Sequence, residues 1–253
     1  MSLDDKIIRH KIFLNRLAGS LSAQLQAGVS AARDIAIKAL FSTSDIRNIN
    51  INKLQSDILT EIDVRSSGAV QLLVELTRVE QNFFVKIVSQ EIDTEYKKVD
   101  EQKLENAIFN KPMGVGQSTN TPNRKMLKAY TALADQHAKA ILQPIKDAQL
   151  RLREPVDIAE EIIAKTEGIF QAQNRTLANT SVNHVSNVVH DEVMRNNLKI
   201  ATHFRWISVL DGRTTDFCRR RDGKIYPIEG SIKPQAHWNC RSDTAPVFKD
   251  ELQ

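Results

Sequence analysis

The sequence is poor in cysteine, glycine, proline and aromatic residues. It holds two cysteines, nine glycines and seven prolines among 253 residues, and aromatic side chains make up only 6%. Two cysteines cannot form the disulfide framework of a small secreted protein. The shortage of glycine and proline argues against an all-β fold with many turns. A core can still form, because 41% of the residues are hydrophobic, but it must consist mainly of Ile, Leu, Val and Ala.

Long apolar runs are missing as well. No segment approaches the roughly 20 apolar residues that span a bilayer. The first residues, from Met1 to Lys6, show no basic stretch followed by an apolar one, as a signal peptide would. We therefore expect a soluble protein that is synthesised in a cytoplasm. The net charge of +4 permits contact with nucleic acid without requiring it.

Residues 1–110 have the pattern of long amphipathic helices. Apolar residues recur at intervals of three and four over residues 8–25, and again over residues 51–91. This spacing predicts a helical N-terminal region. Glycine is a weak helix former, so Gly28 and Gly68 are expected to divide these helices.

The chain between residues 111 and 199 returns to the helical pattern after one interruption. Residues 111–123 contain two prolines and two glycines and are predicted to form a loop or hinge. Residues 124–199 are predicted to be helical and to lead into a final module. Within them, Pro144 is expected to kink or interrupt a helix and Pro155 to open a new one.

Two histidines lie in a helix predicted over residues 174–197. His184 and His190 are six residues apart, and at about 100° per residue they fall on different faces of the helix. They do not have the i, i+4 spacing of a pair of metal ligands. We expect both to be solvated or to act as capping side chains.

Residues 200–253 have a different pattern and form a separate module. Alternating aromatic and β-branched residues predict a strand over 203–210, and a second strand is predicted over 224–227 after the tight turn Asp222–Gly223. A short helix is predicted over 216–221. The expected fold class is therefore mainly α, with long helices and a small C-terminal α+β module.

Both cysteines fall in this module, together with a histidine. Cys218, His237 and Cys240 offer three of the four ligands that tetrahedral zinc needs. Asp211, Asp216, another carboxylate or a water molecule could supply the fourth. The alternatives are a disulfide between the cysteines, which a reducing cytosol disfavours, and two buried thiols beside a structural histidine. The sequence patterns of catalytic zinc sites and of nucleophilic serines are absent, so no catalytic residue is assigned.

The densest basic run is Arg219, Arg220 and Arg221. These side chains could contact DNA phosphates, which would make binding dependent on salt. The alternative is a solvated helix face paired with nearby carboxylates such as Asp216. Short basic runs are weak motifs, so the solvated face is favoured.

An ordered set of motifs runs through the module and identifies a family. It comprises Trp206, Asp211, Gly212, Arg213, Thr214, Cys218, Asp222, Gly223, His237, Asn239, Cys240 and Arg241. In this order the residues resemble the phage Mu F-like (MuF) head morphogenesis family of minor capsid proteins. One position departs from the family: many relatives end the last motif in Cys-Arg-Cys, whereas Ser242 stands here and removes a potential sulfur ligand.

The resemblance implies a structural minor capsid protein of a tailed double-stranded DNA phage, and not an enzyme. Such a protein would be made in the host cytoplasm and reside in the virion, in the head interior or at the portal vertex. Its expected partners are the portal protein, the major capsid or scaffolding protein and packaged DNA, with which it could be ejected. No membrane partner is expected in the assembled head.

Two alternative functions follow from the residues alone. The first is a metal-dependent hydrolase or nuclease that uses Cys218, His237 and Cys240, with Asp211 or Asp216 as its base. The second is a DNA-binding protein that uses the arginine run. Zinc is the one cofactor that these residues suggest.

Overall fold

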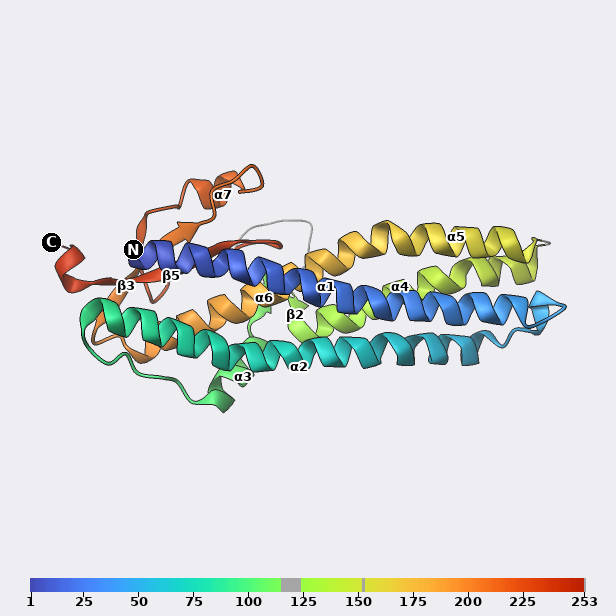
Figure 1. Cartoon of the computed structure of the whole chain (residues 1–253), viewed down its shortest axis with the longest axis horizontal. Coiled ribbons are helices and arrows are strands. Elements are labelled where there is room, and N and C mark those ends of the chain that lie inside the picture. Colours follow the sequence, from blue (N-terminus) through green and yellow to red (C-terminus); the bar gives the residue numbers. More distant parts are fainter. Residues whose placement is uncertain (115–123, 152, 253) are drawn as a thin grey trace. The chain divides into compact units, whose positions relative to one another are not determined.

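The computed structural model describes residues 1–114, 124–151 and 153–252, and over these residues the chain is mainly helical (Figure 1). This confirms the predicted fold class. The helices are α1 (Leu3–Phe41), α2 (Ile51–Ile92), α3 (Glu101–Asn110), α4 (Met126–Leu150), α5 (Pro155–Glu167), α6 (Ile169–Asn196) and α7 (Asp216–Arg219). Short 3-10 helices occupy Ile46–Asn48 and Lys249–Leu252. Within the described residues, none of the helices has both the length and the apolar character to cross a membrane.

The predicted breaks at Gly28 and Gly68 are wrong, because α1 and α2 continue through them. A glycine inside a helix costs only about 1 kcal/mol relative to alanine, which tertiary packing can offset. A Cβ on Gly28 would lie 3.0 Å from the Cβ of Arg65, and one on Gly68 would lie 3.0 Å from Nε2 of Gln24. Both glycines therefore lie where α1 and α2 approach each other closely.

The two prolines behave differently from each other. Pro155 is the first residue of α5, as predicted. A proline costs little there, because a backbone N–H in the first turn of a helix has no carbonyl acceptor within the helix. Pro144 lies inside α4, which continues to Leu150, so the predicted interruption is wrong. The buried side chains of Leu142 and Ile145 flank Pro144 and hold this part of α4 in the core.

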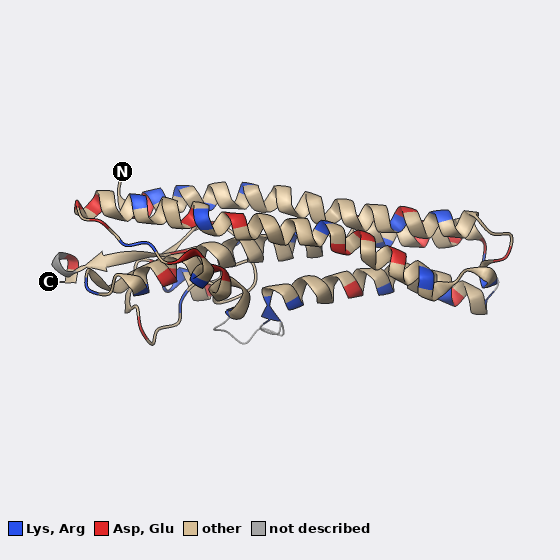
Figure 2. Ribbon diagram, turned by 90° about the horizontal axis from the view of Figure 1, so that it is seen from below, with Lys and Arg blue, Asp and Glu red and all other residues tan. Residues whose placement is uncertain are grey.

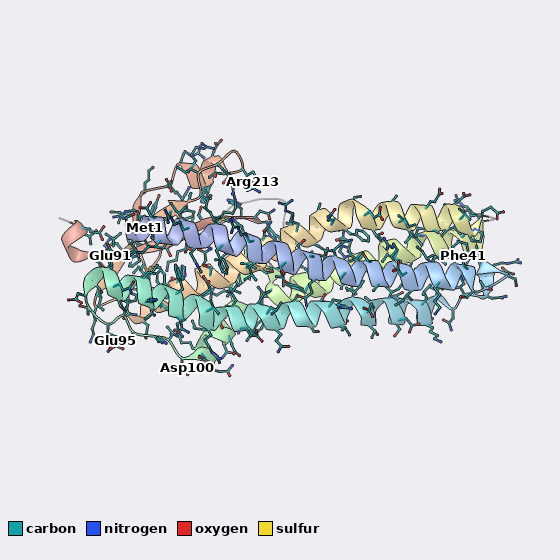
Figure 3. All side chains as sticks on the ribbon, viewed as in Figure 1. Met1, Phe41, Glu91, Glu95, Asp100 and Arg213 are labelled. Atoms are coloured by element: carbon teal, nitrogen blue, oxygen red, sulfur yellow. The ribbon has the colours of Figure 1, made fainter. Side chains whose placement is uncertain are left out.

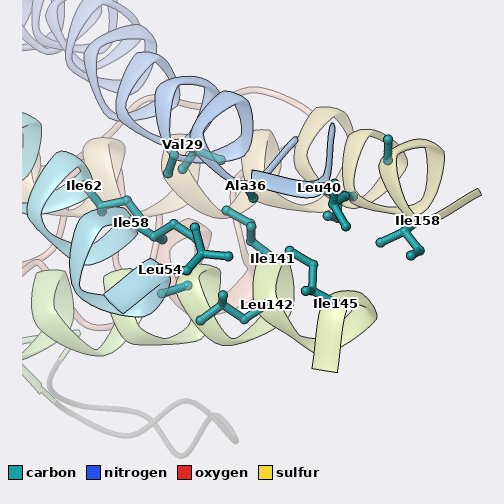
Figure 4. Packing of buried hydrophobic residues seen from close by; sticks show 14 of the residues in the cluster. Val29, Ala36, Leu40, Leu54, Ile58, Ile62, Ile141, Leu142, Ile145 and Ile158 are labelled. Atoms are coloured by element: carbon teal, nitrogen blue, oxygen red, sulfur yellow. The ribbon is translucent and has the colours of Figure 1, made fainter. Parts of the chain in front are cut away.

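The chain forms two compact units. Unit 1 comprises Met1–Ala18, Leu72–Met126 and Asn179–Gln253, and unit 2 comprises Gly19–Gln71 and Leu127–Ala178. Unit 2 has an apolar core to which α1, α2, α4, α5 and the start of α6 contribute (Figure 4). Its largest members are Val29, Leu40, Leu54, Ile58, Ile62, Ile141, Leu142, Ile145, Ile158, Ile162 and Phe170.

Unit 1 contains the C-terminal module. Its strands β3 (Ala201–Ser208), β4 (Ile225–Pro227) and β5 (Ser242–Phe248) form an antiparallel sheet in the order β4-β3-β5. The first two correspond to the predicted strands, and β3 begins two residues earlier than expected. In Figure 1, β5 lies beside the first turns of α1. Asp4 of α1 and Arg205 of β3 form an ion pair there.

A short β-ribbon borders the predicted hinge. Strand β1 (Pro112–Met113) pairs antiparallel with β2 (Arg124–Lys125), which directly precedes α4. The rest of the predicted loop, residues 115–123, lies outside the described residues.

Helix α6 is buried on all sides in unit 1. Every residue from Thr180 to Met194 is buried, including many polar ones. The expectation that His184 and His190 are solvated or capping is therefore wrong, since they are 2% and 0% exposed. A helix whose whole circumference is covered has no polar stripe, so its sequence does not show which faces are buried.

Candidate functional site

The three residues predicted to bind a metal are brought together in the C-terminal module. Cys218 lies on α7, whereas His237 and Cys240 lie in the turn that precedes β5. Sγ of Cys218 is 3.1 Å from Nε2 of His237 and 3.7 Å from Sγ of Cys240. The three ligand atoms lie within 4.8 Å of one another. Both cysteines are buried, and they are not bonded to each other.

Local structure explains how these side chains converge. Thr215 caps α7 by accepting a hydrogen bond from the N–H of Cys218, which fixes the direction of that side chain. The N–H of Cys240 donates to the carbonyl of His237 and closes the turn. Asn239 has a φ of 58°, in the left-handed region that asparagine tolerates better than most residues. Its N–H donates to the hydroxyl of Thr180 on α6.

The imidazole of His237 is oriented by the backbone. Nδ1 of His237 lies 2.8 Å from the carbonyl oxygen of Trp238. Because a carbonyl oxygen can only accept, Nδ1 carries the ring proton and donates a hydrogen bond to that carbonyl. Nε2 then faces Cys218, and the hydroxyl of Thr215 lies 3.1 Å from it. The hydrogen bond with Cys218 raises the pKa of His237.

The two thiols have different proton affinities. The hydrogen bond from Cys218, together with backbone N–H groups of Ser242 and Ala236, lowers the pKa of Cys240 to about 6. The same contact with Cys240, together with burial, raises the pKa of Cys218 to about 12. Two sulfur donors beside an imidazole nitrogen form a donor set suited to a soft metal ion.

Asp211, the predicted fourth ligand, does not join this cluster. Its carboxylate forms a two-pronged ion pair with Arg241 and accepts a hydrogen bond from the N–H of Arg213. The hydrogen bonds from Arg241 hold the pKa of Asp211 well below its usual range. Asp211 thus connects the turn after β3 to the start of β5. It is not positioned to act as a base at Cys218.

The arginine run is divided between two roles. The guanidinium of Arg221 lies 3.5 Å from the ring centre of Phe217 and 5.9 Å from that of Trp206, so it stacks on the module's own aromatic side chains. Arg219 and Arg220 are exposed. Figure 2 shows Lys and Arg interspersed with Asp and Glu along the helices.

The remaining motif residues shape the module. Trp206 is fully buried in β3, and its indole N–H donates to the hydroxyl of Ser208. Asp222 accepts from the N–H of Ser208, and Gly223 takes a φ of 75° in the turn before β4, which a glycine adopts without strain. Thr214 closes the turn after β3 by donating to the carbonyl of Val209. Gly212 and Arg213 are exposed on that turn, where Figure 3 labels Arg213.

A second cluster, which the sequence reasoning missed, lies in the core of unit 1. We call it the buried ion chain: His10 and Lys11 of α1, Glu80 of α2, His190 of α6 and Asp243 of β5. Glu80 contacts His10 at 2.6 Å and His190 at 3.5 Å. Asp243 contacts His190 at 2.9 Å and Lys11 at 3.1 Å. Four elements from distant parts of the sequence therefore meet through ionisable side chains, all of which are buried except the partly exposed His10.

Within the buried ion chain, each charged side chain favours the ionised form of its partners. Burial opposes ionisation of Glu80, but the hydrogen bond with His10 and the ion pair with His190 outweigh it and lower the pKa of Glu80 to about 2. Burial also opposes ionisation of Asp243, but the charges of His190 and Lys11 hold its pKa well below the usual range. In return, the two carboxylates raise the pKa of His190 despite its burial. Buried charges persist when each has an opposite partner.

One feature of the sequence could have indicated the buried ion chain. Ile7, Leu14 and Ala18 form a buried stripe on α1, and Lys11 stands within it at helical spacing. A lysine inside an apolar stripe needs a buried carboxylate opposite it. The partner could not have been identified, because Asp243 lies at the other end of the sequence.

Comparison with known protein families gives one match. Residues 156–245 match the family described as Phage Mu protein F like protein. The matched stretch begins in α5, includes α6, β3, α7 and β4, and ends in β5. It therefore contains Cys218, His237 and Cys240 and most of the predicted motif residues. No curated protein and no solved structure gives a significant match.

Proposed function

Because the chain carries a phage Mu F-like region at residues 156–245, we propose that it is a minor head protein of a tailed double-stranded DNA phage that binds the portal during assembly. The family match carries this proposal, since it supports a head morphogenesis protein. In this role the protein acts by binding other head proteins, without turning over a substrate.

The geometry of unit 1 suits such a role. The phage Mu F-like elements α6 and β5 are joined to the N-terminal helices by Lys11, Glu80 and their partners, so that unit 1 has one continuous core. A protein that must keep its shape while other subunits assemble around it benefits from such cross-connection. The site residues also favour structure over catalysis, because the carboxylate of Asp211 is occupied by Arg241.

The first helices supply a surface for the portal. Phe13 is 54% exposed, and both Phe13 and Phe83 stack on His10, at 5.8 and 3.6 Å between ring centres. We name His10, Phe13 and Phe83 the aromatic patch. Ile12, which is also exposed, adjoins it in sequence. Of these three side chains only Phe13 is exposed. An exposed aromatic side chain that stacks on its neighbours is typical of a surface that a protein partner covers.

The test is to produce the chain with the portal, scaffolding and major capsid proteins of its own phage. Procapsids and DNA-filled heads are then separated by density and their proteins identified by mass spectrometry. We expect this chain in the procapsids, and we expect a tagged copy to retain the portal protein. Absence from both particles would refute the assignment to the head.

A pair of variants tests the proposed contact. Phe13→Ser should reduce retention of the portal protein at least tenfold. Val64→Ser, which changes a similarly exposed apolar residue of α2 in unit 2, should leave it unchanged. Equal retention by the two variants would refute the role of the aromatic patch. Heads emptied of DNA answer the question of ejection, because an ejected protein is lost from them together with the DNA.

A further inference from the structure

We propose that Cys218, His237 and Cys240 bind one zinc ion, with a water molecule as the fourth ligand. The two sulfurs and the imidazole nitrogen are the donor types that zinc prefers in proteins. This inference stands on the donor cluster alone and does not depend on the role proposed for the protein in the phage head.

The spacing of the donors fits tetrahedral zinc better than a disulfide. Two thiolates bound to one zinc at about 2.3 Å in tetrahedral geometry lie about 3.8 Å apart. The observed separation of the two Sγ atoms is 3.7 Å. A disulfide requires about 2.05 Å between the same atoms. Nε2 of His237 lies on the same side, so an ion between the sulfurs is within its reach after a small adjustment.

The support around the ligands is of the kind that metal sites have. A metal-binding histidine commonly donates its other ring N–H to a carbonyl or carboxylate, which fixes the tautomer and the direction of the ring. His237 does so through Nδ1, which lies 2.8 Å from the carbonyl oxygen of Trp238. Cys218 is held by the cap of α7, and Cys240 by the turn that its own N–H closes.

A small pocket lined mainly by polar side chains adjoins Cys218 and His237. Thr215, Arg213 and Asn239 are among the residues that line it. The hydroxyl of Thr215 lies 3.1 Å from Nε2 of His237 and is placed to accept a hydrogen bond from a water on the metal. Ser242 also lines this pocket. In our proposal a water molecule in the pocket completes the tetrahedral coordination.

Binding is balanced in charge. Each cysteine loses its thiol proton to the solvent, so two thiolates neutralise the two charges of the zinc ion while neutral His237 donates its lone pair. The ion then connects α7 to the turn before β5 and closes the loop between Cys218 and Cys240. The consequence is a stiffer module, because the turn and the short helix can no longer separate.

The experiment uses the full chain, purified under reducing conditions and dialysed against zinc. We expect elemental analysis to find about one zinc per chain. Cys218→Ser, His237→Ala and Cys240→Ser should each reduce the zinc content at least fivefold. His203→Ala is the matched control, because it removes a histidine of the same module that lies outside the cluster, and it should keep full zinc content.

A second measurement guards against variants that fail to fold. The wild-type chain is stripped with a chelator, checked for its helical circular dichroism, and titrated with cobalt. We expect the intense visible absorption of tetrahedral cobalt bound to thiolates, saturating at one equivalent and lost on addition of zinc. A folded chain that binds neither ion would overturn the proposal. So would an intact mass two protons below that of the dithiol form with no metal bound, since it would identify a disulfide.

Discussion

The cores of unit 2 and unit 1 differ in whether charged side chains lie among the apolar ones. The core of unit 2 is formed by isoleucine, leucine, valine and alanine side chains from amphipathic helices. The core of unit 1 contains a lysine, two carboxylates and a histidine that contact one another out of reach of solvent. An apolar core tolerates exchanges that conserve side-chain volume, whereas loss of one partner of a buried ion pair leaves an uncompensated charge. Unit 1 is therefore the more sensitive of the two to the loss of a single charged side chain.

The largest expected effect comes from breaking the buried ion chain. Asp243→Ala leaves Lys11 and His190 buried without their acceptor, and we expect a loss of about 3–5 kcal/mol in the free energy of unfolding. Urea titration followed by circular dichroism measures this change. The double variant Lys11→Met, Asp243→Ala should be more stable than the single variant. If the free energy of unfolding of Asp243→Ala lies within about 1 kcal/mol of the wild-type value, the buried ion chain is not a stabilising network.

The corresponding test in unit 2 is a substitution that creates a cavity in its apolar core. Ile58 is fully buried in its apolar core, and Ile58→Ala should lower the free energy of unfolding by about 2–4 kcal/mol, because it removes packing atoms and leaves a cavity. Ile58→Val should cost only about 1 kcal/mol. This graded response, measured in the same titration, distinguishes an apolar core from a charged one. Equal losses for the two substitutions would contradict it.

The pH dependence of stability provides the third comparison. Burial lowers the pKa of His137 in unit 2 to about 4, against 6.5 when unfolded, so folding favours the neutral ring. Its contribution is full above pH 6.5 and is lost as the pH falls toward 4. The loss should be on the order of 2–3 kcal/mol. His137→Leu should make the slope of stability against pH shallower in this range. Identical slopes would contradict a titrating His137.

The stability of unit 1 should also depend on pH, both in this range and at lower pH. His184 is buried with its pKa lowered to about 4, so it adds a loss of the same sign between pH 6.5 and 4, and this loss persists in His137→Leu. Glu80 has a depressed pKa of about 2, so its contribution is present above pH 4.5 and disappears as the pH falls from there toward 2.

The smallest expected effect lies at the surface of the module. Arg221→Ala removes a guanidinium that stacks on Phe217 and should cost about 1 kcal/mol. Arg220→Ala, at an exposed neighbouring position, should change stability by less than about 0.5 kcal/mol. Thermal unfolding of the two variants measures the difference. Equal midpoints would show that the stacking contributes nothing.

The sequence predicted unit 2 better than unit 1, for a physical reason. Apolar residues that recur every three or four positions predict buried residues such as Leu21, Leu25 and Ile58, because each of these helices has one covered face. The same reasoning failed for α6, where no face is exposed, and placed His184 and His190 in solvent. Charged core residues resemble surface residues in a sequence until their partners are known.

The candidate site was predicted in part. Cys218, His237 and Cys240 are together, as their residue types and order suggested. Asp211 was expected to be a ligand because it is a nearby carboxylate. Its pairing with Arg241 depends on how the turn after β3 meets β5, and spacing along the chain does not contain that information.

The discontinuity of unit 1 has a consequence for the newly made chain. All of unit 2 lies before residue 179, so its core can form while the final third of the chain is still being translated. Unit 1 must wait, because Lys11 is made early and its partner Asp243 is made only after all of unit 2. Until then Lys11 and Glu80 have no complete set of partners. Closure of the buried ion chain therefore completes unit 1 only after the whole of unit 2 has been synthesised.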